Sequence, residues 1–261
     1  MKLHLQIAAV LAALSASAAM QAARLEPLHQ YCTIGISENG GFSVRVSDRP
    51  CADRYRCDGG NFDHDPFAGL TGITIADLAR DGSHLTASYT AEAGSFTCTG
   101  DVRNAELRGE SNFTPDAGFV DRMEKLGFTG YDTEKLMAYA FIGVDSGWTK
   151  AMQQTGIHGM TSDNLLALRI FKADPEYIKS ITAMGYEMPD ADKLVGLKVQ
   201  GVNAEEVREI RAMGYQPTLD ELIQIRIFKV TPDFIRRMQA RGFKNLTLEK
   251  LVQIRIFNLA D

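Results

Sequence analysis

The second half of this chain repeats itself five times, from about residue 116 onward, at intervals of 29 or 28 residues. A period of this length is typical of stacked supersecondary units and not of a single globule built around a central cleft. It therefore favours a protein with an extended binding surface over an enzyme. A glycine followed by an apolar residue marks each repeat: Gly127, Gly156, Gly185, Gly214 and Gly242.

Each repeat is predicted to form two short helices, because residues that cap helix N-termini recur at two fixed positions. Their side-chain oxygens can accept hydrogen bonds from the unpaired N–H groups of a first turn. The first series is Asp116, Asp145, Asp174, Asn203 and Thr231, and the second is Asp132, Thr161, Asp190, Thr218 and Thr247. The marker glycine falls where a left-handed residue would end the first helix. We therefore expect an αα-hairpin solenoid over residues 116–261.

The apolar residues of the two helices are expected to form its core. In the first helix they recur at i, i+4 spacing, and the aromatic series Phe119, Trp148, Tyr177 and Phe234 falls on that stripe. The second helix is apolar on nearly all sides, as in residues 222–228. Such a helix is expected to be covered by neighbouring repeats on more than one face.

The last repeat displays the full pattern of the series. It contains Thr231-Pro232-Asp233-Phe234-Ile235, Met238, Gly242-Phe243, Leu246-Thr247, Leu251-Val252 and Arg255-Ile256-Phe257. This pattern resembles the degenerate helical repeats of bacterial envelope proteins, including those after the peptidase of BlaR/MecR-type sensors. The resemblance covers residues 116–258 and implies a helical fold. The chain has no His-Glu-x-x-His motif, so the resemblance does not imply the protease activity of the sensors.

The N-terminus is predicted to be a signal peptide over residues 1–23. Lys2 precedes a short apolar stretch, Ile7 to Leu14, which is followed by small residues. The stretch is shorter than the roughly 20 residues that span a bilayer, and no later segment is a candidate for membrane insertion. We therefore expect a periplasmic or secreted protein that is soluble after cleavage.

Residues 24–115 are predicted to form a small antiparallel β domain. Alternating segments indicate strands at 42–46, 85–89, 96–102 and 105–113, and Asp81-Gly82 between alternating runs indicates a hairpin. The fold class is therefore α+β, a disulfide-linked β domain followed by helical repeats.

All four cysteines precede the repeats: Cys32, Cys51, Cys57 and Cys98. An even number in an exported domain indicates two disulfides, and four cysteines allow three pairings. We favour Cys51 with Cys57 and Cys32 with Cys98. A zinc site is the alternative, but no Cys-x-x-Cys spacing supports it.

One charged pattern follows the repeats. The formal charge of −5 argues against nucleic-acid binding. Within that average, the basic residues Arg169, Lys198, Arg226 and Arg255 occupy one position of successive second helices. They are either a basic surface for an acidic partner protein, or structural cations that satisfy carbonyl groups at helix C-termini.

No catalytic constellation is evident, and no cofactor is expected. The motifs of serine hydrolases, phosphate loops and dinucleotide sites are missing. Asn61, Asp63 and Asp65 resemble the opening of a calcium loop, but the bend-forming glycine and the distal glutamate of an EF-hand are missing. A solvated acidic loop is the favoured interpretation.

These observations predict a non-enzymatic, exported protein-binding protein, for example an inhibitor or an immunity protein that neutralises an envelope-directed effector. The alternative is a cell-wall-associated enzyme or glycan-binding protein acting through the β domain, and a calcium-responsive sensor is held in reserve. The final repeat has no polar cap, so Leu251 to Phe257 are expected to expose an apolar face that supports weak self-association or partner binding.

Overall fold

The computed structural model describes residues 25–50, 59–62, 69–243 and 245–257. The chain divides into two compact units, Met1–Thr149 and Lys150–Asp261. The predicted signal peptide and four predicted site residues, Cys51, Cys57, Asp63 and Asp65, lie outside the described residues. None of the helices in the described part of the chain is long and apolar enough to cross a membrane.

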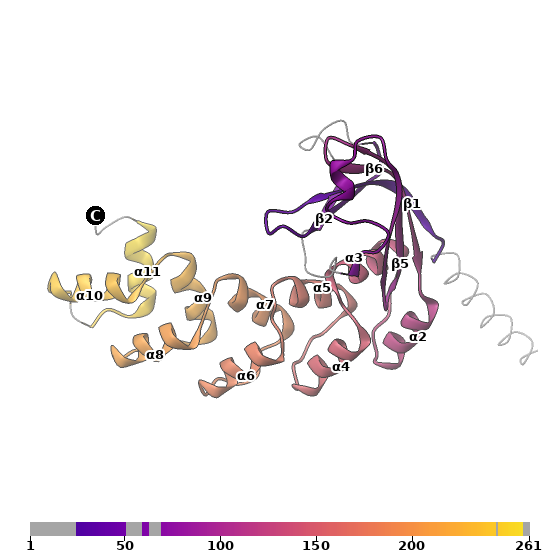
Figure 1. The fold of residues 1–261 in the computed structure, drawn as a ribbon. Coiled ribbons are helices and arrows are strands. Elements are labelled where there is room, and N and C mark those ends of the chain that lie inside the picture. The colour runs from indigo at the N-terminus through magenta and orange to yellow at the C-terminus, as the bar shows by residue number, and fades with distance from the viewer. Residues whose placement is uncertain (1–24, 51–58, 63–68, 244, 258–261) are drawn as a thin grey trace, which may run out of the picture. The chain divides into compact units, whose positions relative to one another are not determined.

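The first unit contains one antiparallel sheet of six strands in the order β3-β2-β1-β6-β5-β4 (Figure 1). All four predicted strands are present within it, and the N-terminal segment around Cys32 adds β1. The strands are β1 (Leu28–Ile36), β2 (Phe42–Ser47), β3 (Gly59–Phe62), β4 (His84–Ala91), β5 (Gly94–Arg103) and β6 (Glu106–Pro115). The α+β class is therefore confirmed.

One predicted turn is wrong. Asp81-Gly82 does not join two paired strands, because it connects a short 3-10 helix, η2 (Asp77–Ala79), to β4. The hairpin between β5 and β6 turns instead at Asn104 and Ala105, which have φ angles of 53° and 60°. Two consecutive left-handed residues are what a type I′ hairpin requires, and asparagine adopts that conformation readily. The strand predicted over residues 105–113 therefore begins one residue later, at Glu106.

Alternation of side chains gives the sheet an apolar and a polar face. On one face, Ile34, Val44, Phe96, Leu107 and Phe113 are almost completely buried. The neighbouring positions on the other face carry threonine, asparagine and glutamate. This pattern is typical of an antiparallel sheet that has its core on one side only.

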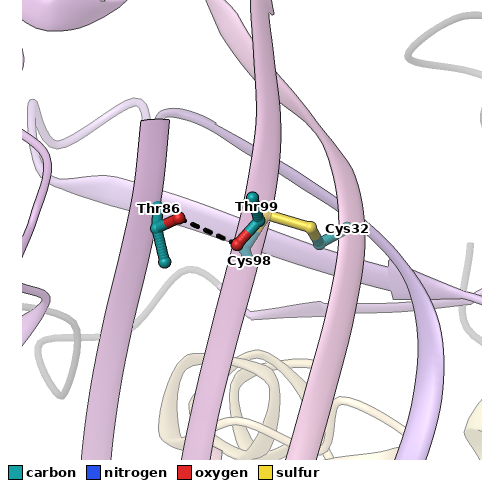
Figure 2. The surroundings of a disulfide bond; sticks show 4 residues. All are labelled: Cys32, Thr86, Cys98 and Thr99. Carbon is teal, nitrogen blue, oxygen red and sulfur yellow. Dashed lines mark hydrogen bonds between the residues drawn. A yellow bond between two sulfur atoms is a disulfide. The ribbon is translucent and has the colours of Figure 1, made fainter. Parts of the chain in front are cut away.

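The predicted disulfide between Cys32 and Cys98 is confirmed, and Figure 2 shows it. Cys32 belongs to β1 and Cys98 to β5, and β6 lies between these strands in the sheet. Their Cα atoms are nevertheless only 5.9 Å apart. Because neighbouring strands are separated by about 4.8 Å, the sheet must bend sharply around β6 to bring the two strands together.

Two helices complete the first unit, α2 (Ala117–Lys125) and α3 (Thr133–Ile142). Helix α3 contacts β4, β5 and β6. The ring of Phe141 meets that of Phe96 edge to face at 5.0 Å, and the Tyr89 hydroxyl donates a hydrogen bond of 3.3 Å to the Ala140 carbonyl. The first predicted repeat therefore shares a core with the sheet.

Glu92, in the turn between β4 and β5, joins this sheet to the helices within the first unit. Its carboxylate accepts hydrogen bonds from the Ser146 amide at 2.7 Å, the Ser146 hydroxyl at 2.6 Å and Arg122 Nε at 2.6 Å. Ser146 is the first residue of α4 (Ser146–Gln154), the helix that crosses the division between the units. The glutamate thus satisfies a free N–H group at a helix N-terminus.

The second unit consists of short helices, of which each second helix contacts the second helix of the next repeat: α5 with α7, α7 with α9, and α9 with α11 (Figure 1). Helices α8 and α10 also contact each other. Nine-residue helices are marginal in isolation, so these contacts must supply most of their stability. The helices are α5 (Ser162–Ile170), α6 (Pro175–Ala183), α7 (Ala191–Val199), α8 (Ala204–Ala212), α9 (Leu219–Ile227), α10 (Pro232–Ala240) and α11 (Leu248–Ile256).

The predicted helix caps are confirmed in both series. Each of the ten side chains accepts a hydrogen bond from the backbone N–H three residues later, as Asp174 does from Tyr177 and Thr218 from Glu221. The five marker glycines all have positive φ angles, between 80° and 93°. A residue with a Cβ atom is strained in this left-handed conformation, which explains why glycine recurs there.

Candidate protein-binding surface

The four predicted basic residues occupy one position, the eighth residue of each second helix. In three repeats the basic side chain contacts the third residue of the preceding first helix. Lys198 Nζ lies 4.3 Å from the ring centroid of Tyr177, and the Arg255 guanidinium lies 4.1 Å from that of Phe234. In the repeat between them, where Glu206 replaces the aromatic residue, Arg226 forms a 3.0 Å ion pair with it.

Two of the arginines also reach back to the preceding repeat. Arg226 Nε donates a 2.7 Å hydrogen bond to the carbonyl of Gln200, and Arg255 Nη2 donates one of 3.1 Å to the carbonyl of Lys229. Both acceptors lie just beyond the C-terminus of the previous second helix. These are the contacts expected if the basic residues are structural cations that satisfy carbonyl groups at helix C-termini. Recognition of an acidic partner by Arg169, Lys198, Arg226 and Arg255 stays a prediction.

The aromatic series behaves as part of the core to differing extents. Phe119 and Phe234 are buried, whereas Trp148 and Tyr177 are half-buried. Burial raises the pKa of Tyr177 to about 12, and its hydroxyl donates a 3.0 Å hydrogen bond to the Val202 carbonyl. The phenol is therefore a neutral hydrogen-bond donor at physiological pH.

An exposed row of aliphatic residues lies immediately beside the basic residues. The ninth residue of each second helix in the second unit is β-branched, and between 43% and 49% of its surface is exposed. We call this set the aliphatic row: Ile170, Val199, Ile227 and Ile256. Because the four residues hold the same position on helices that contact one another, they form one surface. The row is larger than the isolated exposed aliphatic residues that are normal in proteins.

The helix face that carries the aliphatic row extends one turn toward the N-terminus of each helix. The fifth residue there is half-buried in three of the helices, namely Leu166, Val195 and Ile223, and buried in α11. A Cβ atom added to Gly196 of α7 would lie 3.5 Å from Ile223 Cδ1 of α9. Ile223 of α9 therefore packs over Gly196 of the preceding second helix.

The equivalent face of α3, in the first unit, is covered. Its ninth residue is Phe141, which is completely buried, and its fifth residue, Met137, is buried as well. The rings of Phe96 and Tyr89 in the sheet cover Phe141. One face of the repeat is therefore buried by a sheet in the first repeat, and is left half exposed to solvent in the four that follow.

Carboxylates border the aliphatic row on the N-terminal side. The second residue of each second helix is acidic and exposed, as in Asp163, Asp192, Asp220 and Glu249. These residues precede the fifth and ninth residues by three and seven positions, which places all three on one helix face. Their negative charge is stabilising at the N-terminus of a helix. Lys193 forms an ion pair with Asp220 of the next repeat, so this edge is partly neutralised.

The predicted apolar face of the last repeat needs correction. Leu251 and Val252 are buried, so the exposed apolar residues between Leu251 and Phe257 are Ile256 and Phe257, with Phe257 67% exposed. The exposure of Ile256 is not a property of the chain end, because Ile170, Val199 and Ile227 share it. Self-association through this repeat stays a prediction.

The described part of the chain does not bring together a metal site. Among those residues, no group of three His, Cys, Asp or Glu side chains could hold a metal ion. Of the calcium-loop candidates, Asn61 lies in β3 and the two aspartates lie outside the described residues.

Comparison of the chain with protein-family models, curated proteins and solved structures finds no match.

The aliphatic row is not among the features predicted from the sequence, although the sequence contains a signal for it. Each of its members directly follows one of the basic residues that were singled out. The second helices are apolar on nearly all sides, and neighbouring repeats are expected to cover them on more than one face, which does not single out the ninth residue as exposed. In each second helix of the second unit, packing buries the fourth residue, such as Leu194. The seventh residue, such as Leu197, is buried in most of these helices, and the ninth is left half exposed.

Proposed function

We propose that this chain is an exported, non-enzymatic repeat protein whose helical hairpins stack as a solenoid and bind another protein through the aliphatic row. The observation that carries the proposal is the contrast between Phe141 and its repeat equivalents. The ninth residue is covered by the sheet in α3, whereas it is nearly half exposed in α5, α7, α9 and α11.

The chemistry of the row suits protein recognition. β-branched side chains have few rotamers, so little conformational entropy is lost when a partner immobilises them. Burying the exposed half of one such side chain stabilises a complex by about 1 kcal/mol. Four of them on one surface supply a central apolar contact of the kind that dominates protein interfaces.

The acidic border indicates the character of the partner. A protein that covers the aliphatic row must meet Asp163, Asp192 and Glu249 at its edge. Basic residues beside an apolar centre would complement these carboxylates and speed association. On the side of these carboxylates, the proposed partner therefore carries lysine or arginine next to its apolar surface.

The proposed location follows from two features. The N-terminal segment has the pattern of a signal peptide, and the Cys32–Cys98 disulfide is of a type that persists in oxidising compartments. The resemblance of the repeats to those of bacterial envelope proteins supports the same location. An inhibitor or immunity protein that neutralises an envelope-directed effector would use such a surface.

Site-specific cross-linking in the native compartment tests the proposal. A photoreactive residue at position 227 is expected to capture one protein in stoichiometric amounts, because this position lies near the middle of the row. The same residue at Ile75, which is 40% exposed in the first unit, serves as the matched control. The captured protein must then bind the purified chain in a 1:1 complex. Equal capture at both positions, or a captured protein that does not bind when purified, contradicts the proposal.

A further inference from the structure

We propose that a second copy of this chain docks face to face on the aliphatic row and covers it in the absence of another partner. This homodimer uses the surface of the proposed function, but its formation depends only on the residues of α5, α7, α9 and α11. The charges at the two edges of the surface carry the inference, because they are opposite in sign. A surface of this kind is complementary to itself.

The second helices of the second unit lie parallel to one another, with like ends adjacent. Helices α7 and α9 show this arrangement at both ends. At the N-terminal ends, Lys193 of α7 forms an ion pair with Asp220 of α9. At the C-terminal ends, Arg226 of α9 donates its 2.7 Å hydrogen bond to the carbonyl of Gln200, just beyond α7. One edge of the surface is therefore formed by helix N-termini and the other edge by helix C-termini.

The two edges carry opposite charges. The N-terminal edge has the exposed carboxylates of the second residues, Asp163, Asp192, Asp220 and Glu249. On the C-terminal edge the eighth residue of each helix is lysine or arginine, and an exposed lysine follows the ends of α5 and α9, namely Lys172 and Lys229. The half-buried fifth residues and the aliphatic row lie between these edges, so the surface has an acidic edge, an apolar centre and a basic edge.

Lys172 and Lys229 are not explained by the turns in which they lie. Both have a φ angle of 53°, which is left-handed. The equivalent residues after α3 and α7 are Gly143 and Gly201, with φ angles of 76° and 69°. A lysine is strained in this conformation and a glycine is not. The two lysines therefore add charge to the basic edge at some cost to the stability of the turns.

A two-fold axis parallel to the aliphatic row satisfies both edges at once. It lays each second helix antiparallel over the same helix of the other copy, so each acidic edge meets a basic edge. With the axis at the seventh residue of each helix, the ninth residue lies over the fifth residue of the other copy, as Ile227 over Ile223. The second residue then lies about 7.5 Å from the axis and the eleventh about 6 Å beyond it, at about 1.5 Å per residue. Asp220 of one copy is thereby brought within reach of Lys229 of the other.

The other two-fold arrangement is unfavourable. An axis parallel to the helices sets acidic edge against acidic edge and basic edge against basic edge, which like-charge repulsion opposes. The charges thus select one orientation of the dimer, and the apolar centre supplies most of the attraction.

The size of the surface predicts a weak dimer. Four helices of nine residues, each about 13.5 Å long and about 9 Å from the next, present about 500 Å² per copy. The dimer therefore buries about 1,000 Å² in total, which is at the lower limit for a specific interface. Such a dimer forms at high concentration and is displaced by a partner that binds more tightly.

Sedimentation equilibrium of the full mature chain, between about 5 µM and about 500 µM, tests the proposal. The chain is expected to dimerise with a Kd of about 10–100 µM. Asp220→Lys and Lys229→Asp should each raise this Kd at least about tenfold, because each sets like charges opposite one another. The double variant Asp220→Lys/Lys229→Asp reverses both charges and should dimerise like the wild type. Lys125→Asp, at an exposed position of α2 in the first unit, is the matched control and should leave the Kd unchanged.

Three outcomes would overturn the proposal. A chain that stays monomeric up to about 500 µM has no such dimer. A dimer whose Kd is unaffected by Ile227→Asp is formed through another surface. A double variant that stays as weak as the two single variants, with all of them folded by circular dichroism, shows that the two charges do not meet across the dimer.

Failure of this dimer is distinguishable from failure of the proposed function. A photoreactive residue at position 227 gives a product of twice the mass of the chain when it captures a second copy, and a product of another mass when it captures a foreign protein. A chain that is monomeric and still captures a foreign protein refutes the dimer alone. A chain that forms the dimer and captures no other protein supports the dimer and refutes the proposed function.

Discussion

Phe141 of α3 lies edge to face against Phe96 of β5, with 5.0 Å between the ring centroids. The position that Phe141 holds in its helix is held by Ile227 in α9, where nearly half of the side chain is exposed. A single repeat position is thus part of a core in the first unit and part of the surface in the second. The proposed function depends on this difference, because natural proteins seldom leave the same apolar position exposed four times without a use for it.

Truncation at the two equivalent positions should have unequal effects on stability. Phe141→Ala removes a completely buried ring, so it should lower the free energy of unfolding by about 3–5 kcal/mol. Ile227→Ala removes a half-exposed side chain and should cost about 1 kcal/mol or less. Urea denaturation followed by circular dichroism measures both. Similar losses for the two variants would show that the aliphatic row is not a free surface.

Glu92 should stabilise the first unit in a pH-dependent manner. Burial alone would raise its pKa, but the hydrogen bonds from Ser146 and the Arg122 guanidinium outweigh burial and lower the pKa below 4.5. A carboxylate with a lowered folded-state pKa stabilises the fold above its unfolded pKa, and this stability is lost as the pH falls through the folded value. Glu92→Gln should therefore cost about 1 kcal/mol at pH 7.

The pH profile provides the control for this variant. The difference in unfolding free energy between the wild type and Glu92→Gln should be constant above about pH 5 and should shrink as the pH falls below 4.5. Loss of the ion pair between Arg80 and Asp77 serves as the comparison. That pair is exposed, so its loss should change the free energy of unfolding little. A difference for Glu92 that grows on acidification would contradict the assigned hydrogen bonds.

The pair of Glu206 and Arg226 should tolerate exchange for an aromatic residue. Glu206 occupies the position of Tyr177 and Phe234, which contact Lys198 and Arg255 through their ring faces. Glu206→Tyr should therefore retain stability within about 0.5 kcal/mol, because a cation–π contact replaces the ion pair. Glu206→Ala should lose about 1 kcal/mol, because it leaves Arg226 without that partner. Thermal unfolding measures the stability of both variants. Equal losses of stability would mean that the contact between Arg226 and residue 206 does not stabilise the fold.

The Cys32–Cys98 disulfide should contribute strongly to the stability of the sheet. It closes a sequence separation of 66 residues, and native disulfides in small domains contribute about 2–4 kcal/mol. The double variant Cys32→Ser/Cys98→Ser should lower the unfolding free energy by that amount and leave Cys51 and Cys57 in place. Retention of the full stability in this variant would show that the bend around β6 does not require the covalent link.

The helical repeats were largely predictable from the sequence because their determinants are local. A cap residue needs only the N–H groups of the next turn, and a marker glycine needs only its own φ angle, so both signals survive without knowledge of the tertiary fold. The strands at 42–46 and 96–102 were predictable for the same reason, from alternation along the segment.

The surfaces were harder to predict because they depend on which neighbours are present. The ninth residue of each second helix is apolar in all five repeats, from Phe141 to Ile256, and only the sheet distinguishes the first. In the sheet, Glu110 is paired with Tyr31 on one side and with Thr99 on the other. These neighbours depend on the strand order, in which β1 pairs with β6, a strand far from it in the sequence. Pairing between distant strands leaves no periodic signal in the sequence.

The most direct test of the central claim is a binding titration of the cross-linked partner, once purified, against three forms of the chain. With Val199→Asp/Ile227→Asp the Kd should rise at least about 100-fold, since two charges would be placed in the apolar contact. Ile36→Asp/Ile75→Asp introduces the same charges at similarly exposed positions of the first unit and should bind like the wild type. An unchanged Kd for the variant of the aliphatic row, with both variants folded, would contradict the account.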